Sequence, residues 1–122
     1  MSEQPTCEER WEGALERTME SLREMGGDPQ QLSEYGLSFE YDVDEGAFIW
    51  CMSWGGPADY FHFYADVGSH GFKCHKVEYQ FQDWFDNHTE EVRDADGGFL
   101  INLFDSYFAE MAPAALEEAL DD

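Results

Sequence analysis

Apolar residues near the start of the sequence recur at the spacing of a helix. Between Trp11 and Met25 they fall three or four positions apart, which places them on one stripe of an α-helix. Thr6 and Glu9 stand before this stripe in a capping-box pattern, which supplies side-chain partners for the free N–H groups at a helix start. The glycine pair at 26–27 ends the pattern. These signals predict an amphipathic first helix.

The period then changes from helical to alternating, as expected for strands with one buried face. Apolar and polar residues alternate along 37–44, and further runs rich in apolar and aromatic residues occupy 47–54, 59–67 and 72–83. Short connections rich in glycine, aspartate and proline separate these four runs. Because short connections join antiparallel neighbours, the sequence predicts a four-stranded antiparallel meander.

The remaining segments lie on either side of this meander. Residues 28–32 open with Asp-Pro and favour a short helical turn. Residues 86–98 are rich in charge and turn formers, which predicts an exposed acidic loop. Residues 100–111 carry an apolar stripe at helical spacing and predict a second main helix. We expect this helix to break near Pro113 and to be followed by a short acidic amphipathic tail at 114–120.

The predicted class is α+β: a four-stranded antiparallel meander flanked by an N-terminal and a C-terminal helix. We expect the two main helices to cover one face of the sheet. With 43% hydrophobic and 16% aromatic residues, the chain has the apolar surface that disordered acidic tails lack. No internal repeat or change of composition marks a linker, so residues 1–122 are interpreted as a single acidic domain.

Charge is the feature that bears most directly on function. The chain has 28 Asp and Glu against six Lys and Arg, a formal net charge of -22. Acids exceed bases in every third of the sequence. Repulsion at this charge density destabilises a compact state, so an advantage outside folding is needed to explain it. The excess favours a basic partner and disfavours binding of phosphates, nucleic acid or anionic membranes.

The three cysteines and the hydropathy of the chain indicate a compartment. Cys7, Cys51 and Cys74 are odd in number and lack a ligand spacing, and no apolar leader precedes them. We therefore expect reduced and mostly buried thiols. No apolar run approaches the roughly 20 residues that span a bilayer. A soluble protein of the bacterial cytoplasm is the prediction.

A row of glutamates on the first helix is the sharpest pattern in the sequence. Five of them stand four residues apart, so that the row rises about 6 Å per step and drifts around the solvent side of the apolar stripe. Like charges at this spacing weaken a helix by a few tenths of a kcal/mol per pair. The alternative is an ordinary solvated face whose glutamates pair with the interleaved Arg10, Arg17 and Arg23.

Two further acidic surfaces are predicted. One runs along the first strand, and Asp59 and Asp66 bracket a neighbouring strand beside it. The other extends beyond the last strand of the meander. Duplex DNA carries one charge per about 1.7 Å of axis, so a Lys and Arg array that binds DNA could also engage carboxylate rows. The expected partner-binding residues are Glu8, Glu12, Glu16, Glu20, Glu24, Glu40, Asp42, Asp44, Asp83, Asp86, Glu90, Glu91, Asp94 and Asp96.

The sequence contains no pattern that indicates catalysis or a cofactor. His62, His70, Cys74 and His75 are near in sequence, but no pair has a recognised metal-ligand spacing, and we assign no metal. No glycine pattern of a nucleophile elbow or phosphate-binding loop is present. We therefore predict that the protein is not an enzyme and needs no cofactor.

Two aromatic residues adjoin the acidic surface. Trp84 and Phe85 lie between Asp83 and Asp86, just after the fourth predicted strand. If exposed, they would form an apolar anchor ringed by acids against a basic protein surface. Burial in the core is the more ordinary role for such residues.

In size, acidity and α+β build, the chain resembles the phage- and plasmid-borne DNA mimics that block restriction enzymes or CRISPR effector complexes. The resemblance is one of character over the whole chain and rests on no shared motif. It implies a non-enzymatic inhibitor whose carboxylates occupy a channel meant for nucleic acid, on a CRISPR complex by preference or a restriction enzyme. The expected partner is thus a basic nucleic-acid-binding protein, and dimerisation of the chain is left open.

Other functions are compatible with the same sequence. An adaptor or immunity-type protein could recognise one basic protein without imitating nucleic acid. In a salt-loving organism an acidic surface is general and says nothing about a partner, although three cysteines and twenty aromatic residues in so short a chain make this less attractive. An enzyme is the least favoured class, although it stays open because a site on an α+β domain need not show in the sequence.

Overall fold

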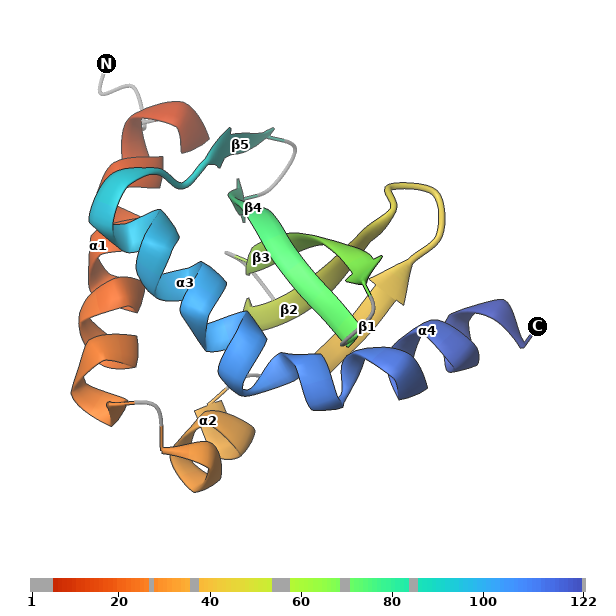
Figure 1. The fold of residues 1–122 in the computed structure, drawn as a ribbon. Coiled ribbons are helices and arrows are strands. Elements are labelled where there is room, and N and C mark those ends of the chain that lie inside the picture. The colour runs from red at the N-terminus through yellow and green to blue at the C-terminus, as the bar shows by residue number, and fades with distance from the viewer. Residues whose placement is uncertain are drawn as a thin grey trace, which may run out of the picture.

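The structure is a computed structural model, and it describes residues 6–26, 28–35, 38–53, 58–68, 71–83 and 86–121. Its elements are α1 (Cys7–Met25), α2 (Pro29–Tyr35), β1 (Ser38–Asp42), β2 (Ala47–Ser53), β3 (Ala58–Gly68), β4 (Gly71–Asp83), β5 (Asp86–Glu91), α3 (Asp94–Ser106), the 3₁₀ turn η1 (Phe108–Glu110) and α4 (Ala112–Leu120). The strands form one antiparallel sheet in the order β1-β2-β3-β4-β5 (Figure 1). The α+β class is confirmed, but the sheet has five strands instead of the predicted four.

The start and end of α1 agree with the predicted signals. The Thr6 side chain accepts a hydrogen bond from the backbone N–H of Glu9 at 3.2 Å, which satisfies one free donor of the first turn. Gly26 ends the helix in the left-handed region with φ 60°, where a side chain would be strained. Its N–H donates to the carbonyl of Arg23. The predicted turn at 28–32 is present as α2, which extends to Tyr35.

The predicted loop at 86–98 is wrong. Residues 86–91 form β5, which pairs with the end of β4 from Asp83 opposite Asp86 to Glu78 opposite Glu91, and α3 begins at Asp94. Five of the six β5 residues are exposed, so the strand has no buried side to produce an alternating pattern. Backbone pairing with β4 forms this strand, and charged side chains are common on such edge strands.

One face of the sheet carries the core. Trp11 of α1 contacts the ring of Tyr79, and Phe104 of α3 contacts Phe63, so α1 and α3 cover the same face, as predicted (Figure 1). The Trp11 indole N–H donates to the Tyr79 carbonyl at 2.6 Å, which fixes the position of α1 on β4. The largest fully buried side chains are Tyr79, Phe48, Phe61, Phe63, Phe104 and Phe108.

The second main helix breaks earlier than predicted. α3 ends at Ser106, and Tyr107 adopts φ -120° and ψ -57° before η1 begins. Pro113 lies in the first turn of α4, where a missing N–H costs no intrahelical hydrogen bond, so this proline starts a helix instead of ending one. The predicted tail is therefore helical, and α4 packs along the edge strand β1 (Figure 1). No helix in the described part of the chain has the length and apolar character needed to cross a membrane.

All three cysteines are free and buried, as the sequence predicts. A bulge at His75 lets Cys74 and Val77 share the core face, because Tyr64 pairs with Lys76 and Ala65 pairs with Cys74. Desolvation raises the pKa of each thiol, to about 11 for Cys74.

These thiols should react slowly in the native protein. Burial limits access, and a raised pKa reduces the thiolate fraction that attacks alkylating reagents, so at about pH 8 we expect little labelling until the chain unfolds. Mass spectrometry of iodoacetamide-treated samples with and without urea measures this directly. Equal labelling rates in the two samples would contradict the buried placement.

Candidate partner-binding surfaces

The glutamate row lies on the solvent side of α1, as the sequence predicts. Trp11, Leu15 and Leu22 lie on the opposite side and pack into the core. At about 1.5 Å per residue the row spans about 24 Å of helix. All five glutamates are exposed: Glu8, Glu12, Glu16, Glu20 and Glu24.

The arginines of α1 do not neutralise this row. Arg10 Nη1 lies 2.5 Å from Asp83 Oδ2 at the end of β4, and Arg23 Nη2 lies 2.6 Å from Asp96 Oδ1 in α3. Arg17 makes no ion pair with a described residue. The alternative of a salt-bridged helix face therefore fails for these residues, because two of the three guanidinium groups bind acids on other elements.

Only the first glutamate of the row lies within ion-pair distance of a basic side chain among the described residues. Glu8 Oε2 lies 3.9 Å from His88 Nδ1 of β5. The other four make no ion pair with any described side chain: Glu12, Glu16, Glu20 and Glu24. The row is thus an exposed line of carboxylates whose charge is left to solvent ions or to a partner.

The strand surface is smaller than predicted. Glu40 and Asp42 are exposed on β1, but β1 ends at Asp42, and Asp44 lies in the turn after it, not on the strand. Asp42 Oδ1 accepts hydrogen bonds from the N–H groups of Asp44 at 3.0 Å and Glu45 at 3.2 Å. Aspartate favours turns of this kind, so Asp42 has a structural role in the hairpin.

The third predicted surface begins at the end of β4, and its acids mainly connect elements of the fold. They are Asp83, Asp86, Glu90, Glu91, Asp94 and Asp96. Asp86 Oδ2 accepts a hydrogen bond from the N–H of Cys7 at 2.8 Å, and this bond lowers the pKa of Asp86 at the N-terminus of α1. Asp83 and Asp96 bind the arginines of α1. Glu90 lies 3.3 Å from His88 Nε2.

The other acids of this surface make fewer contacts with the rest of the fold. Glu91 lies 3.5 Å from Arg93 Nη2. Asp94 makes no ion pair with a described residue, and its φ of 58° places it in the left-handed region at the start of α3. Over most of the third surface, a partner would therefore have to compete with internal ion pairs and hydrogen bonds. Along α1, it would meet no such competition from Glu12 to Glu24.

Asp59 was expected on an acidic surface, and this prediction is wrong. The residue is only 8% exposed and lies on the core side of β3. Its carboxylate accepts hydrogen bonds from the hydroxyls of Ser53 at 2.5 Å, Tyr79 at 2.5 Å and Thr18 at 3.5 Å. Its spacing from Phe61 is the sequence signal that could have placed it on the buried face. Asp66, the other acid of the pair, is exposed.

A second polar cluster lies on the opposite face of the sheet and was missed in the sequence. The Tyr64 hydroxyl lies 2.7 Å from Glu45 Oε1 and 2.8 Å from Glu78 Oε1, and desolvation together with these carboxylates raises the pKa of Tyr64. His62 is 6% exposed, and its Nε2 lies 2.8 Å from Gln80 Oε1. Its Nδ1 lies 2.8 Å from Glu45 Oε1, too poorly aligned for a hydrogen bond. The cluster ties the β1–β2 turn to β3.

The candidate metal residues do not converge. Cys74 is buried in the core, whereas His75 is exposed and lies 3.5 Å from Asp66. Within the described ranges no three His, Cys, Asp or Glu side chains are placed to hold a metal ion. The predictions for His70 and for the aromatic pair at 84–85 fall outside the described residues.

The comparisons with known proteins identified no relative of this chain. No protein-family model, no curated protein and no solved structure matches the chain. Any functional proposal therefore depends on the geometry and charge of the acidic surfaces.

Proposed function

We propose that the protein is a non-enzymatic acidic inhibitor that imitates nucleic acid and blocks the DNA-binding surface of a bacterial defence complex. The observation that carries this proposal is the α1 row, in which Glu12, Glu16, Glu20 and Glu24 are exposed and lack ion pairs with described residues. A CRISPR effector is the preferred target, and a restriction enzyme is the next.

Simple electrostatics supports the row as the contact. A protein that binds duplex DNA presents Lys and Arg to one phosphate charge per about 1.7 Å of axis. Carboxylates that rise about 6 Å per step and drift around the solvent side of the helix offer such a surface a row of negative charges, although a sparser one than DNA. The remaining excess charge surrounds the row and steers a basic partner toward it, so association should be fast and sensitive to salt.

The alternative is an acidic adaptor that binds one basic protein without imitating DNA. The same exposed carboxylates would serve it, and its partner would not need a nucleic-acid channel. The two functions differ in one measurable respect: a mimic and duplex DNA exclude each other from the partner, whereas an adaptor and DNA do not.

Capture from a bacterial lysate separates these functions. Tagged protein is immobilised, and bound proteins are eluted in parallel by a salt gradient and by excess duplex DNA, then identified by mass spectrometry. We expect a nuclease or CRISPR complex that either treatment releases, because both remove the same electrostatic contacts. A single partner that salt releases and DNA does not would support the adaptor and contradict mimicry.

A further inference from the structure

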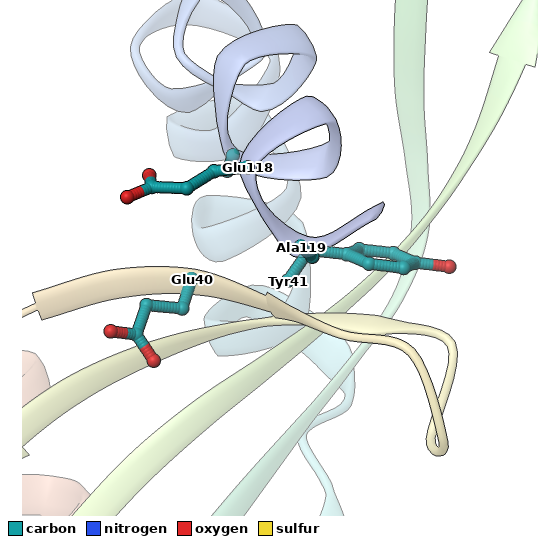
Figure 2. A pocket seen from close by; sticks show the side chains of 5 residues that line it. Glu40, Tyr41, Glu118 and Ala119 are labelled. Carbon is teal, nitrogen blue, oxygen red and sulfur yellow. The ribbon is translucent and has the colours of Figure 1, made fainter. Parts of the chain in front are cut away.

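A small hollow lies where α4 meets the edge of the sheet. It has a volume of about 210 Å³ and is lined by Glu40 and Tyr41 of β1 and by Ala115, Glu118 and Ala119 of α4 (Figure 2). The two alanines stand one helical turn apart, and their small side chains leave space between α4 and the strand. β1 is the outermost strand of the sheet, so the hollow opens at its edge.

The hollow is lined by two alanines on its helical side and by two glutamates, one from the strand and one from the helix. Figure 2 shows the side chains of Glu40 and Glu118 extending to the same side of the hollow, with the ring of Tyr41 on the other. Neither glutamate makes an ion pair with a described residue. Elsewhere in the molecule, the half-buried Asp83 already has an arginine partner, since Arg10 lies 2.5 Å from it. The two glutamates at the hollow have no such partner among the described residues. The shape and charge of the hollow therefore suit a side chain with an aliphatic stem and a cationic end.

We propose that this hollow binds the side chain of an arginine from the partner protein. The guanidinium lies between the carboxylates of Glu40 and Glu118, and its methylene stem packs on Ala115 and Ala119. Arginine suits the site better than lysine because its planar group offers five donors, enough to reach two carboxylates at once. The proposal rests on the proposed function in one respect, namely that the partner is basic.

The site adds a contact apart from the glutamate row, because α4 and α1 lie at opposite sides of the molecule in Figure 1. Charge argues against a second copy of this chain as the occupant. Each copy carries 28 acids against six bases, and four of those bases already form ion pairs with described carboxylates. Two copies would bring like charges together at the hollow.

Direct titration tests the site without any protein partner. The ¹⁵N-labelled full chain is titrated with N-acetyl-arginine methylamide, and the matched probe is the citrulline compound, which has the same shape without the charge. We expect saturable shifts at the amides of Tyr41, Ala115 and Ala119 with the arginine probe only. The variant Glu40→Gln with Glu118→Gln should weaken this binding about ten-fold.

The controls separate this site from general attraction to an acidic protein. A variant with Glu12→Gln, Glu16→Gln and Glu20→Gln in α1 should leave the shifts at Tyr41, Ala115 and Ala119 as they are in the wild type. Shifts spread over all acidic surfaces, equal shifts with citrulline, or no shifts at the hollow would overturn the proposal. Because the titration uses no protein partner, these outcomes are independent of whether DNA competes for the captured complex.

Discussion

Phe108→Ala should lower the free energy of unfolding by about 3–5 kcal/mol, the usual cost of truncating a fully buried aromatic side chain. Phe108 is 1% exposed, stacks on Phe39 with ring centroids 4.6 Å apart, and meets the Trp50 ring at 4.7 Å. It also belongs to η1, which joins α3 to α4. The substitution therefore leaves a cavity where three segments meet and loosens the attachment of α4.

Urea unfolding followed by circular dichroism measures this effect. Leu120→Ala is the matched control, because Leu120 is 63% exposed and its truncation should change stability by less than about 0.5 kcal/mol. If Phe108→Ala and Leu120→Ala proved equally mild, the placement of η1 in the core would be wrong.

Asp59→Ala should lower the free energy of unfolding by about 2–4 kcal/mol, because it removes a charged acceptor from several hydroxyls in a buried site. The donors are Ser53, Thr18 and Tyr79, and Tyr79 is itself fully buried. Without the carboxylate, the Tyr79 hydroxyl loses the acceptor that lies 2.5 Å away on the core side of the sheet. Its burial then carries the desolvation cost of an unsatisfied donor.

Two further variants separate this hydrogen-bond network from the loss of a negative charge. Tyr79→Phe removes one donor and keeps the ring, so it should cost about 1–2 kcal/mol. Asp66→Ala removes an equal charge from a side chain that is 85% exposed, and it should be close to neutral. If Asp59→Ala were as neutral as Asp66→Ala in urea unfolding, the buried network would not contribute to stability.

The parts of the fold that the sequence predicts are those with strong local patterns. α1 has an apolar stripe, a cap at Thr6 and a terminating glycine, and β1 to β4 have apolar or alternating runs between turn residues. β5 has neither, because its side chains are almost all exposed and its partner strand supplies the hydrogen bonds. The break at Tyr107 also escaped prediction, since Pro113 offered a more obvious end and instead begins α4.

The candidate binding surfaces also include features that the sequence predicts and features that it does not. Exposure of the glutamate row is a consequence of helical periodicity, so it could be predicted. The partners of Arg10 and Arg23 could not, because each binds an acid 73 residues away in the sequence. Because of these two ion pairs, Arg10 and Arg23 do not neutralise the glutamate row. The same ion pairs engage Asp83 and Asp96 of the third surface. Likewise, the hydroxyls of Ser53 and Tyr79 reach Asp59 only once the sheet has formed, and that of Thr18 only once α1 packs on the sheet.

If the proposed function is right, the position of the α1 carboxylates, and not net charge alone, creates the binding surface. Two variants that each remove four negative charges test it. One neutralises the row with Glu12→Gln, Glu16→Gln, Glu20→Gln and Glu24→Gln. The other neutralises exposed acids elsewhere with Asp66→Asn, Glu110→Gln, Glu117→Gln and Asp121→Asn.

The decisive measurement compares how much of the DNA-displaced partner each immobilised variant captures from a bacterial lysate at equal loading. Circular dichroism first establishes that both variants fold as the wild type does. We predict that the row variant loses capture at least about ten-fold, while the control variant stays close to the wild type. Equal losses in the two variants, or no loss in the row variant, would contradict the account.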